Sequence, residues 1–354
     1  MRVLIATDAW YPQVNGVVQT LMSVGRALER MGVEVSFLTP EGIPSVPLPT
    51  YPDIRLALPR ARDIAERIDA IQPDVIHIAT EGPIGHIVRR HCLKRRRGFT
   101  TSFHTRFADY AAARLPIPRS LSWCWLRWFH NAGRVTMAST ESLSNELAAR
   151  GFRKLMRWPR GVDTNLFQPR FGCDLGLPRP VFLSVGRVAV EKNIEAFLAL
   201  DLPGSKVVVG DGPARQELAL RYPSAVFLGT KKGQELADVY ASADVFVFPS
   251  RTDTFGLVLL EALASGLPIA GFPVDSNRDV VGSAPVAALD EDLRAACLKS
   301  LTLSRAACRA YAKTMTWDES ARCFLNNLKS SGALQVRREP HAVSSAGAPL
   351  AGAA

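Results

Sequence analysis

The chain has 354 residues, of which 47% are apolar and 21% are charged, which is the composition of a globular enzyme of about two domains. Its six cysteines are scattered without a C-x-x-C pair, which argues against a disulfide scaffold or a metal finger and favours a reducing cytoplasm. The net charge of +10 indicates an anionic partner, which could be nucleic acid, a phosphate-bearing small molecule or an acidic membrane surface. The apolar run at residues 3–6 is too short for a signal peptide, and no later run reaches the roughly 18 residues of a membrane span, so we expect neither.

The first half of the chain alternates apolar strands with helix-like segments. A strand at residues 3–7 precedes an amphipathic helix at 17–31, and a second strand at 33–38 follows the helix. Further strands are expected at residues 75–78, 100–103 and 135–139. This order predicts a parallel sheet with helices on both faces.

The second half repeats the pattern after a proline-rich break at residues 169–180. Its strands are expected at residues 181–185, 206–209, 226–228, 245–248 and 268–271. Two doubly wound halves joined near residue 175 predict a cleft where the carboxyl ends of both sets of strands meet. From residue 330 onward, Ser, Ala, Gly and Pro predominate, which predicts a disordered tail.

Two carboxylates lie in the segment of residues 253–268, which follows a buried strand and opens a helix ended by Gly266. Glu261 stands on a helix that is apolar nearly all round, so its carboxylate must meet hydrogen-bond donors. The donor is either a local arginine or a ligand hydroxyl such as those of a ribose, with Asp253 reaching a second set.

Two cations, Arg187 and Lys192, lie before a predicted helix near Asn193, where they oppose the helix dipole unless they hold an anion such as a diphosphate. A solvated Arg187 and a salt bridge from Lys192 to Glu191 or Glu195 are the alternative. Gly16, after the first strand, allows the backbone to approach a ligand closely.

Two further features narrow the chemistry. The turn Gly210-Asp-Gly-Pro lacks the third glycine of a dinucleotide fingerprint, which argues against a dehydrogenase. His104 follows a strand at its carboxyl end, where such folds keep their sites, although a lone histidine is more often structural. His77, inside a strand, is expected to be structural.

A basic helix is predicted at residues 83–97, with Ile84, Ile87, Val88 and Cys92 on one face and no acid from residue 84 to residue 97. The opposite face carries Arg89, Arg90, Lys94, Arg96 and Arg97. Nearby tryptophans suit a bilayer interface, and they are Trp123, Trp125 and Trp128. We expect this helix and these tryptophans to attach the protein to anionic lipid. The alternative is that the basic residues are simply solvated and the tryptophans lie in the core. Nucleic-acid binding is disfavoured, because no nucleic-acid-binding signature accompanies the basic residues.

Three motifs occur along the chain in the order found in one enzyme family. They are Arg187-x4-Lys192, the Gly-Asp-Gly-Pro turn, and Asp253-x7-Glu261 with Glu261-Ala-Leu-Ala-Ser-Gly266. Over residues 1–328 the chain resembles the retaining glycosyltransferases of family 4, which implies the α/β GT-B fold of two Rossmann-like, doubly wound domains facing across a cleft. The segments 11–18, 80–83, 102–107 and 160–163 look closest to one lipid-linked branch. That branch includes diacylglycerol glycosyltransferases, sulfoquinovosyl transferases and GDP-mannose-dependent mannosyltransferases.

The resemblance implies a role for each matching residue. Gly16 would approach a diphosphate that Arg187 and Lys192 bind, and Glu261 would hold the ribose. Amides near Gly256 and Leu257 would serve the phosphates and sugar, His104 would contact the sugar near its 6-position, and Asp253 stands where the family usually has Glu. Lys232 lies where the family contacts the base. The implied chemistry is electrostatic stabilisation of the departing diphosphate, with no metal, cofactor or protein nucleophile.

We therefore expect a membrane-facing acceptor domain at residues 1–170, a nucleotide-sugar domain at 171–315, a helix at 316–330 that can cross back to the first domain, and a disordered tail at 331–354. The expected enzyme is a cytoplasmic glycosyltransferase, peripheral on the inner face of the membrane. It would move a hexose or hexuronic acid, UDP-linked in preference, to a lipid such as diacylglycerol. The alternatives are a GDP-mannose-dependent mannosyltransferase and, remotely, a non-catalytic nucleotide-sugar or nucleic-acid binding protein.

Overall fold

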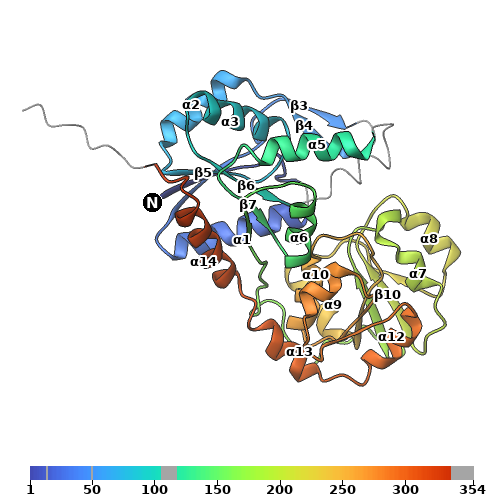
Figure 1. Cartoon of the computed structure of the whole chain (residues 1–354). Helices are drawn as coiled ribbons and strands as arrows, with labels where there is room; N and C mark the ends of the chain where they lie inside the picture. The colour runs from blue at the N-terminus through green and yellow to red at the C-terminus, as the bar shows by residue number, and fades with distance from the viewer. Residues whose placement is uncertain (13–14, 49–50, 105–117, 336–354) are drawn as a thin grey trace, which may run out of the picture.

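The computed structural model describes residues 1–12, 15–48, 51–104 and 118–335. Two α/β domains, each built on a parallel sheet, occupy the upper and lower parts of Figure 1. The predicted fold class is therefore confirmed.

The N-terminal sheet has six parallel strands in the order β2-β1-β5-β6-β7-β8. Their bounds are β1 Arg2–Ala6, β2 Glu34–Leu38, β5 Val75–Ile78, β6 Thr100–Phe103, β7 Thr136–Ala138 and β8 Leu155–Arg157. The helices are α1 Gly16–Arg30, α2 Ala61–Ile71, α3 Pro83–Lys94, α5 Arg119–His130 and α6 Glu141–Ala149. On β1, Val3 and Ile5 pack against α1, whereas Leu4 and Ala6 pack on the other face with α2 and α3. The alternation of the strand thus buries both faces of the sheet.

The C-terminal sheet has six parallel strands in the order β11-β10-β9-β12-β13-β14. Their bounds are β9 Val181–Val185, β10 Ser205–Val209, β11 Val226–Phe227, β12 Val245–Phe248, β13 Ile269–Gly271 and β14 Ala287–Leu289. The helices are α7 Ile194–Leu198, α8 Arg215–Arg221, α9 Gly233–Ser242, α10 Leu257–Ala264, α11 Asp275–Val281, α12 Leu293–Ser300 and α13 Arg305–Ala312, and a 3-10 turn, Val190–Lys192, precedes α7. On β9, Val181 and Leu183 face one core and Phe182 faces the other.

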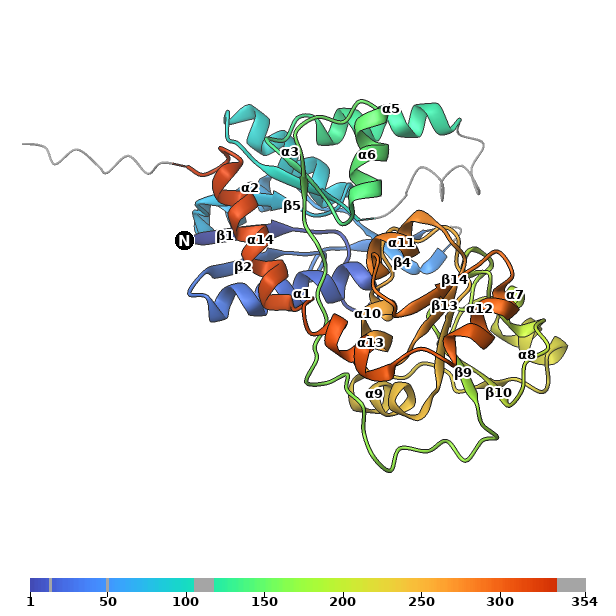
Figure 2. The same cartoon turned by 60° about the horizontal axis from the view of Figure 1, so that its bottom comes forward.

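Helix α14, Trp317–Ser330, leaves the C-terminal domain and packs on the N-terminal one. Figure 2 shows it beside α1. Its Trp317, Phe324 and Leu328 join the core that contains Val3 and Ile5 of β1. The chain thus crosses between the domains twice, and Val162 of the first crossing donates its N–H to the carbonyl of Met315 in the second, at 3.0 Å.

The structure differs from the expected elements in several places. The hairpin of β3, Ser45–Leu48, and β4, Tyr51–Ala57, was not expected, nor were the short edge strands β8 and β14. Helix α3 ends at Lys94 instead of residue 97, because Arg96 takes a left-handed conformation with φ of 52°. Residues 331–335, expected in the tail, pack on the N-terminal domain: Ala333 is buried, and the N–H of Gln335 donates to the carbonyl of Asp74. The rest of the expected tail, 336–354, lies outside the described residues.

Candidate active site

The candidate site lies where the loops after β6, β7 and β12 meet at the domain interface. Thr254, in the loop after β12, donates from Oγ1 to the carbonyl of His104 at 2.9 Å. The hydroxyl of Ser139, after β7, donates to the carbonyl of Thr254 at 3.4 Å. These contacts bring the carboxyl ends of strands from both sheets together, which is where ligands of such folds bind.

Helix α10 begins directly at this interface. Gly256 precedes it with φ of 78°, a left-handed conformation that glycine adopts without steric cost. The first helical residue, Leu257, lies against Gly16 at the start of α1, where an added Cβ would be 3.5 Å from Leu257 Cδ1. The structure therefore brings together Gly16, Gly256 and Leu257, three of the residues predicted to serve the donor.

Glu261 is buried on α10, with 5% of its surface exposed. Tyr240 of α9 donates to Oε2 at 3.0 Å, and Gln19 of α1 donates from Nε2 to Oε1 at 3.2 Å. Within the described ranges no Arg or Lys forms an ion pair with this carboxylate, so the local arginine partner is wrong. Burial raises the pKa of the Glu261 carboxyl, although the bonds from Tyr240 and Gln19 oppose the shift.

Asp253 and Lys192 form an ion pair between Lys192 Nζ and Asp253 Oδ1. The predicted alternative, a salt bridge from Lys192 to Glu195, is wrong, because Glu195 pairs with Arg221. The second oxygen of Asp253, Oδ2, is buried and accepts no hydrogen bond from any described residue. A buried carboxylate oxygen without a donor is costly, so this atom marks a place for a ligand hydroxyl.

Arg187 and Lys192 lie on one tight turn between β9 and α7. The N–H of Ala189 donates to the carbonyl of Arg187 at 3.1 Å, and the N–H of Lys192 to that of Ala189 at 2.9 Å. Because α7 is only five residues long, its dipole adds little, and an anion here would be bound mainly by the two side-chain cations. Lys232 is exposed at the start of α9. Within the described residues it forms no hydrogen bond or ion pair with Arg187, Lys192, Asp253 or Glu261.

His104 is half-buried just beyond β6, and both ring nitrogens have protein partners. Its Nε2 lies 2.8 Å from Ser102 Oγ, and its Nδ1 lies 3.2 Å from Arg160 Nη2. Burial and the Arg160 charge hold the pKa of His104 well below its ordinary value of 6.5, so the ring is neutral. His77, expected to be structural, is fully buried and bonds to Thr100 and Ser102.

The predicted membrane residues divide into buried and exposed groups, and three of them need correction. Arg89 is buried, and it donates to the carbonyls of Phe129 and Trp128. Trp123 is buried beneath Arg150, and Arg97 donates to the carbonyl of Pro73. These three side chains hold the domain together and are not free to meet a lipid. The exposed members of the set are Arg90, Lys94, Arg96 and Trp128, while Trp125 is half-buried against His86.

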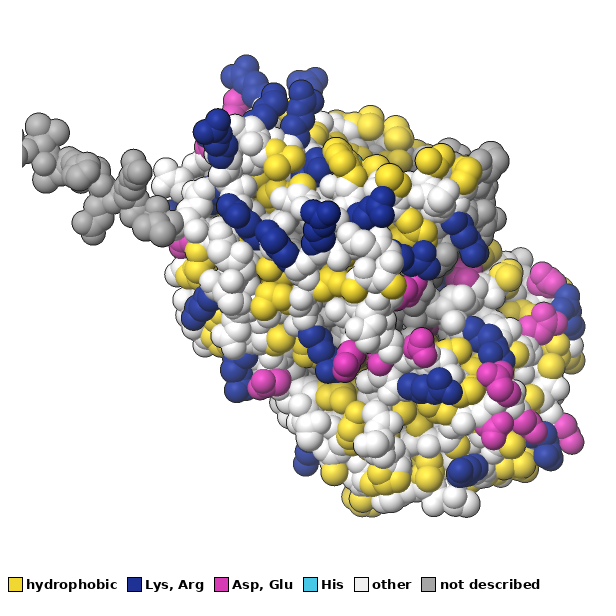
Figure 3. Space-filling view, viewed as in Figure 1, with side chains coloured by type: hydrophobic (Ala, Val, Ile, Leu, Met, Phe, Trp, Pro, Cys, Tyr) yellow, Lys and Arg dark blue, Asp and Glu magenta, His cyan; other side chains and the backbone are white. Residues whose placement is uncertain are grey.

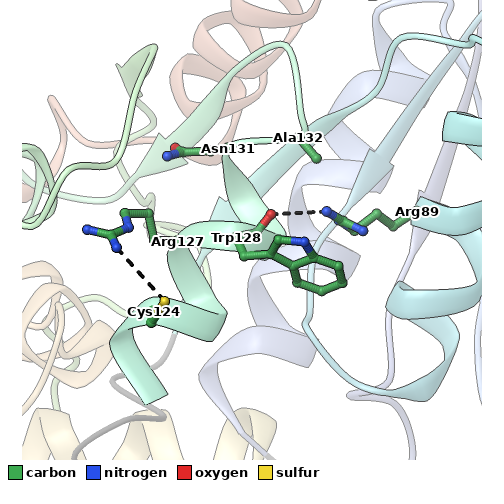
Figure 4. A pocket seen from close by; sticks show the side chains of 6 residues that line it. All are labelled: Arg89, Cys124, Arg127, Trp128, Asn131 and Ala132. Atoms are coloured by element: carbon green, nitrogen blue, oxygen red, sulfur yellow. Dashed lines mark hydrogen bonds between the residues drawn. The ribbon is translucent and has the colours of Figure 1, made fainter. Parts of the chain in front are cut away.

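A shallow pocket of about 400 Å³ lies on α5 near these residues (Figure 4). Its lining consists of Arg89, Cys124, Arg127, Trp128, Asn131 and Ala132. The Arg89 guanidinium lies over the Trp128 ring, 3.7 Å from its centroid, and anchors α5 to α3. The lining therefore combines two arginines and an indole, without an acid.

Among the described residues, no helix is long and apolar enough to cross a membrane. In the same part of the chain, no cluster of three or more His, Cys, Asp or Glu side chains is arranged to hold a metal ion.

Sequence reasoning missed four side chains that shape the site. Gln19 and Tyr240, the donors to Glu261, lie on helices far from it in sequence, and nothing in their local pattern marks them. Ser139 and Arg160 also reach the site only through the tertiary fold. Arg160 lies in the segment 160–163, which resembles the lipid-linked branch, yet the sequence indicated no role for this residue.

Comparison with known proteins identifies the family of the chain. Residues 14–166 match the family described as Glycosyltransferase Family 4, and residues 179–302 match Glycosyl transferases group 1. A GDP-mannose-dependent alpha-mannosyltransferase of Mycobacterium tuberculosis is 31% identical, covering 79% of this chain and 81% of that protein. The sulfoquinovosyl transferase SQD2 of Arabidopsis thaliana is 32% identical, covering 77% and 59%. An alpha-monoglucosyldiacylglycerol synthase of Streptococcus pneumoniae is 26% identical, covering 85% and 78%.

A solved structure supports the fold in the same way. The sucrose-phosphate synthase of Thermosynechococcus elongatus superposes with a TM-score of 0.75 at 18% identity, covering 93% of this chain and 98% of that one. The two matched families follow each other along the chain in the order of its two domains. The chain therefore belongs to glycosyltransferase family 4 and is a glycosyltransferase of the GT-B fold.

Proposed function

We propose that this glycosyltransferase moves a hexose or hexuronic acid from a UDP-sugar to a lipid such as diacylglycerol, with retention of the α configuration. The donor site is proposed from two carboxylates at the domain interface, Glu261, which is buried, and Asp253, whose Oδ2 atom is buried. Among the described residues, Glu261 has only neutral donors and Asp253 has an oxygen with no donor. Both are suited to accept hydrogen bonds from the hydroxyls of a nucleotide sugar.

The diphosphate of the donor lies between Arg187 and Lys192 in this proposal. Its charge competes with Asp253 for Lys192, so donor binding releases Asp253 Oδ1 from the ion pair. Both oxygens of Asp253 then accept from hydroxyls of the sugar. The ribose hydroxyls donate to Glu261 and replace the bond from Gln19. The ligand contacts at Asp253 Oδ1 and Glu261 thus replace existing polar contacts, and the contact at Asp253 Oδ2 supplies a donor to an atom that has none among the described residues.

The transfer itself breaks the bond between the anomeric carbon and the diphosphate oxygen. The lipid hydroxyl attacks the same face of the sugar, and its proton passes to an oxygen of the departing diphosphate. Arg187 and Lys192 stabilise the negative charge that develops on that diphosphate. The products are an α-glycolipid and a free nucleoside diphosphate.

The acceptor side rests on what we call the α3–α5 surface, the exposed residues Arg90, Leu93, Lys94, Arg96, Leu121, Arg127 and Trp128. Neither α3 nor α5 contains an acid. Leu121 is 61% exposed and Trp128 53%, and such side chains settle at a bilayer interface beside basic residues. In Figure 3, basic side chains crowd the N-terminal domain, whereas most acidic ones in view lie on the C-terminal domain. We place the enzyme on the cytoplasmic face of an anionic membrane, with this surface toward the lipid.

A second candidate, a GDP-mannose-dependent α-mannosyltransferase, is favoured by one observation. The Mycobacterium tuberculosis relative bears that name and matches over four fifths of its length. The same carboxylates and cations would serve GDP-mannose, since they contact ribose, phosphate and sugar and not the base.

One experiment tests both candidates. The purified protein is incubated with diacylglycerol in anionic vesicles and with labelled UDP-glucose, UDP-galactose, UDP-glucuronate or GDP-mannose, and the extracted lipids are chromatographed. We expect labelled glycolipid from a UDP-sugar and an equal amount of UDP. Label from GDP-mannose alone would establish the second candidate. No labelled lipid from any donor, with wild type equal to the matched control Lys192→Gln, would refute the lipid acceptor.

A further inference from the structure

A line of polar side chains runs through the N-terminal domain from β5 to the candidate site. Thr100 and Ser102 lie on the same face of β6, and His104 continues their spacing. His77 Nδ1 lies 2.8 Å from Thr100 Oγ1, and His77 Nε2 lies 3.0 Å from Ser102 Oγ. Ser102 Oγ lies 2.8 Å from His104 Nε2, and His104 Nδ1 lies 3.2 Å from Arg160 Nη2. The line therefore ends at Arg160, beside the loop that carries Thr254.

The Arg160 side chain determines which atom donates in each hydrogen bond along this line. A guanidinium can only donate, so Nδ1 of His104 must accept and carries no proton. A neutral imidazole then has its proton on Nε2, which donates to Ser102 Oγ. The Ser102 hydroxyl donates onward to His77 Nε2, and His77 donates from Nδ1 to Thr100. One arginine thus determines the tautomer of two histidines.

Arg160 is an unusual residue to bury for stability alone. It is 5% exposed, its Nη1 donates to the carbonyl of Trp158 at 2.7 Å, and its Cζ lies 4.5 Å from the centre of the Trp158 ring. In the described segments no carboxylate pairs with it. Burial lowers the pKa of Arg160 to about 9, which leaves it cationic at neutral pH. A buried cation without an acid costs stability, so its position calls for another reason.

We propose that Arg160 is a positioning residue that fixes His104 as the neutral Nε2–H tautomer. For catalysis this rests on the proposed function and on the expected contact of His104 with the donor sugar near its 6-position. A bound diphosphate would draw a proton onto a nearby imidazole, and Arg160 opposes that protonation. The ring therefore keeps the same hydrogen-bonding pattern before and after the donor binds.

Two further described groups act in the same direction as Arg160. His77 of β5 and His130 of α5 disfavour the charged ring, and the Glu81 carboxylate is bonded to His130. Burial is the largest cause of the lowered pKa of His104, and Arg160 is the next. Because the pKa of His104 is lowered, the ring stays neutral across the physiological range.

Nitrogen NMR of the full-length enzyme labelled at histidine tests the proposal directly, with His104→Gln used to assign the signals. We expect wild-type His104 to show a protonated Nε2 and an unprotonated Nδ1, unchanged from pH 5.5 to 8.5. A protonated Nδ1 in the wild type, or a titration within that range, would overturn the proposal without any variant at Arg160. In Arg160→Met, which keeps the length and apolar stem, we expect mixed tautomers and a pKa of His104 higher than in the wild type, although burial still holds it below the ordinary value of 6.5.

Kinetics give a second readout. In Arg160→Met, kcat should fall roughly tenfold per pH unit below the new pKa, while wild type and Arg160→Lys, which retains a donor, stay flat. A uniform loss at every pH, with the wild-type tautomer retained, would assign Arg160 to folding alone. If the tautomer is as proposed but no sugar is transferred, the proposed function fails and this inference stands.

Discussion

The two carboxylates of the site have different partners. Asp253 has a cation, Lys192, on one oxygen, whereas the donors to Glu261 among the described residues are the neutral side chains of Tyr240 and Gln19. Burial raises the pKa of Glu261, so the folded protein holds that proton more tightly than the unfolded chain does. The contribution of Glu261 to stability is therefore fully present below its ordinary pKa of 4.5 and is lost as the pH rises through the raised value.

Glu261→Gln should separate stability from binding. At pH 7.5 the amide removes a buried charge, so the melting temperature of the ligand-free protein should stay the same or rise. The affinity for the free nucleoside diphosphate should fall by roughly 1.5 to 3 kcal/mol, the contribution of charged hydrogen bonds. Differential scanning calorimetry and titration calorimetry measure the two quantities.

Asp253→Asn is the matched comparison. Its partner in the proposal is the sugar, and its amide no longer holds Lys192 as an ion pair, so diphosphate affinity should hold or rise while turnover with the full donor falls. Unaltered diphosphate affinity in both variants would refute the ribose role of Glu261.

Helices α3 and α5 act as one element because Arg89 joins them. Its bonds to the carbonyls of Trp128 and Phe129 fix the end of α5 on α3. The basic side chains that remain exposed on α3 are then the ones able to meet lipid phosphates, and each contributes about 1 kcal/mol near an anionic surface.

Replacing Arg90, Lys94 and Arg96 with Gln should therefore weaken sedimentation with anionic vesicles by about 3 kcal/mol, or roughly 100-fold. Nucleotide affinity should not change. The control removes the same charge from the C-terminal domain, at Arg294, Lys299 and Lys313, and should sediment as the wild type does. Equal sedimentation of both variants would remove the α3–α5 surface as the attachment site.

Among the helices and strands, the sequence predicted those that a clear apolar pattern marks. Buried parallel strands such as β5, β6, β9 and β12 are continuous apolar runs, and the structure has them at the expected residues. Edge strands β8 and β14 are only partly buried, so their sequences need not form a continuous apolar run. The burial of Arg89 and Trp123 was also not predictable, because helical spacing shows which face a residue occupies but not what packs on that face.

The sequence predicted those site residues that have charged side chains and follow the end of a strand. Lys192, Asp253 and Glu261 follow strands or open a helix, and their types point to phosphate and hydroxyl ligands. Gln19 and Arg160 reach the site by packing of distant elements, which no local pattern encodes.

In the whole molecule, the two crossings between the domains touch at Gly161. An added Cβ there would lie 2.4 Å from the carbonyl carbon of Thr316 and from the backbone nitrogen of Trp317. Only glycine allows this approach, which lets Val162 bond to Met315.

Gly161→Ala should force the crossings apart and lower the stability by about 1 to 3 kcal/mol. The matched control is Gly16→Ala, whose new methyl would meet only Leu257 at an ordinary 3.5 Å. Thermal unfolding measures both. A melting temperature of Gly161→Ala equal to that of the control would show that the crossings separate freely.

The path of α14 also sets an order for synthesis. The N-terminal domain is assembled from two pieces of chain, with the whole C-terminal domain inserted between them. During translation every strand of the C-terminal domain leaves the ribosome before Trp317, Phe324 and Leu328, which complete the first core. The domain that is begun first is thus finished last, and until then the face of its sheet beside α1 remains uncovered for a chaperone to bind.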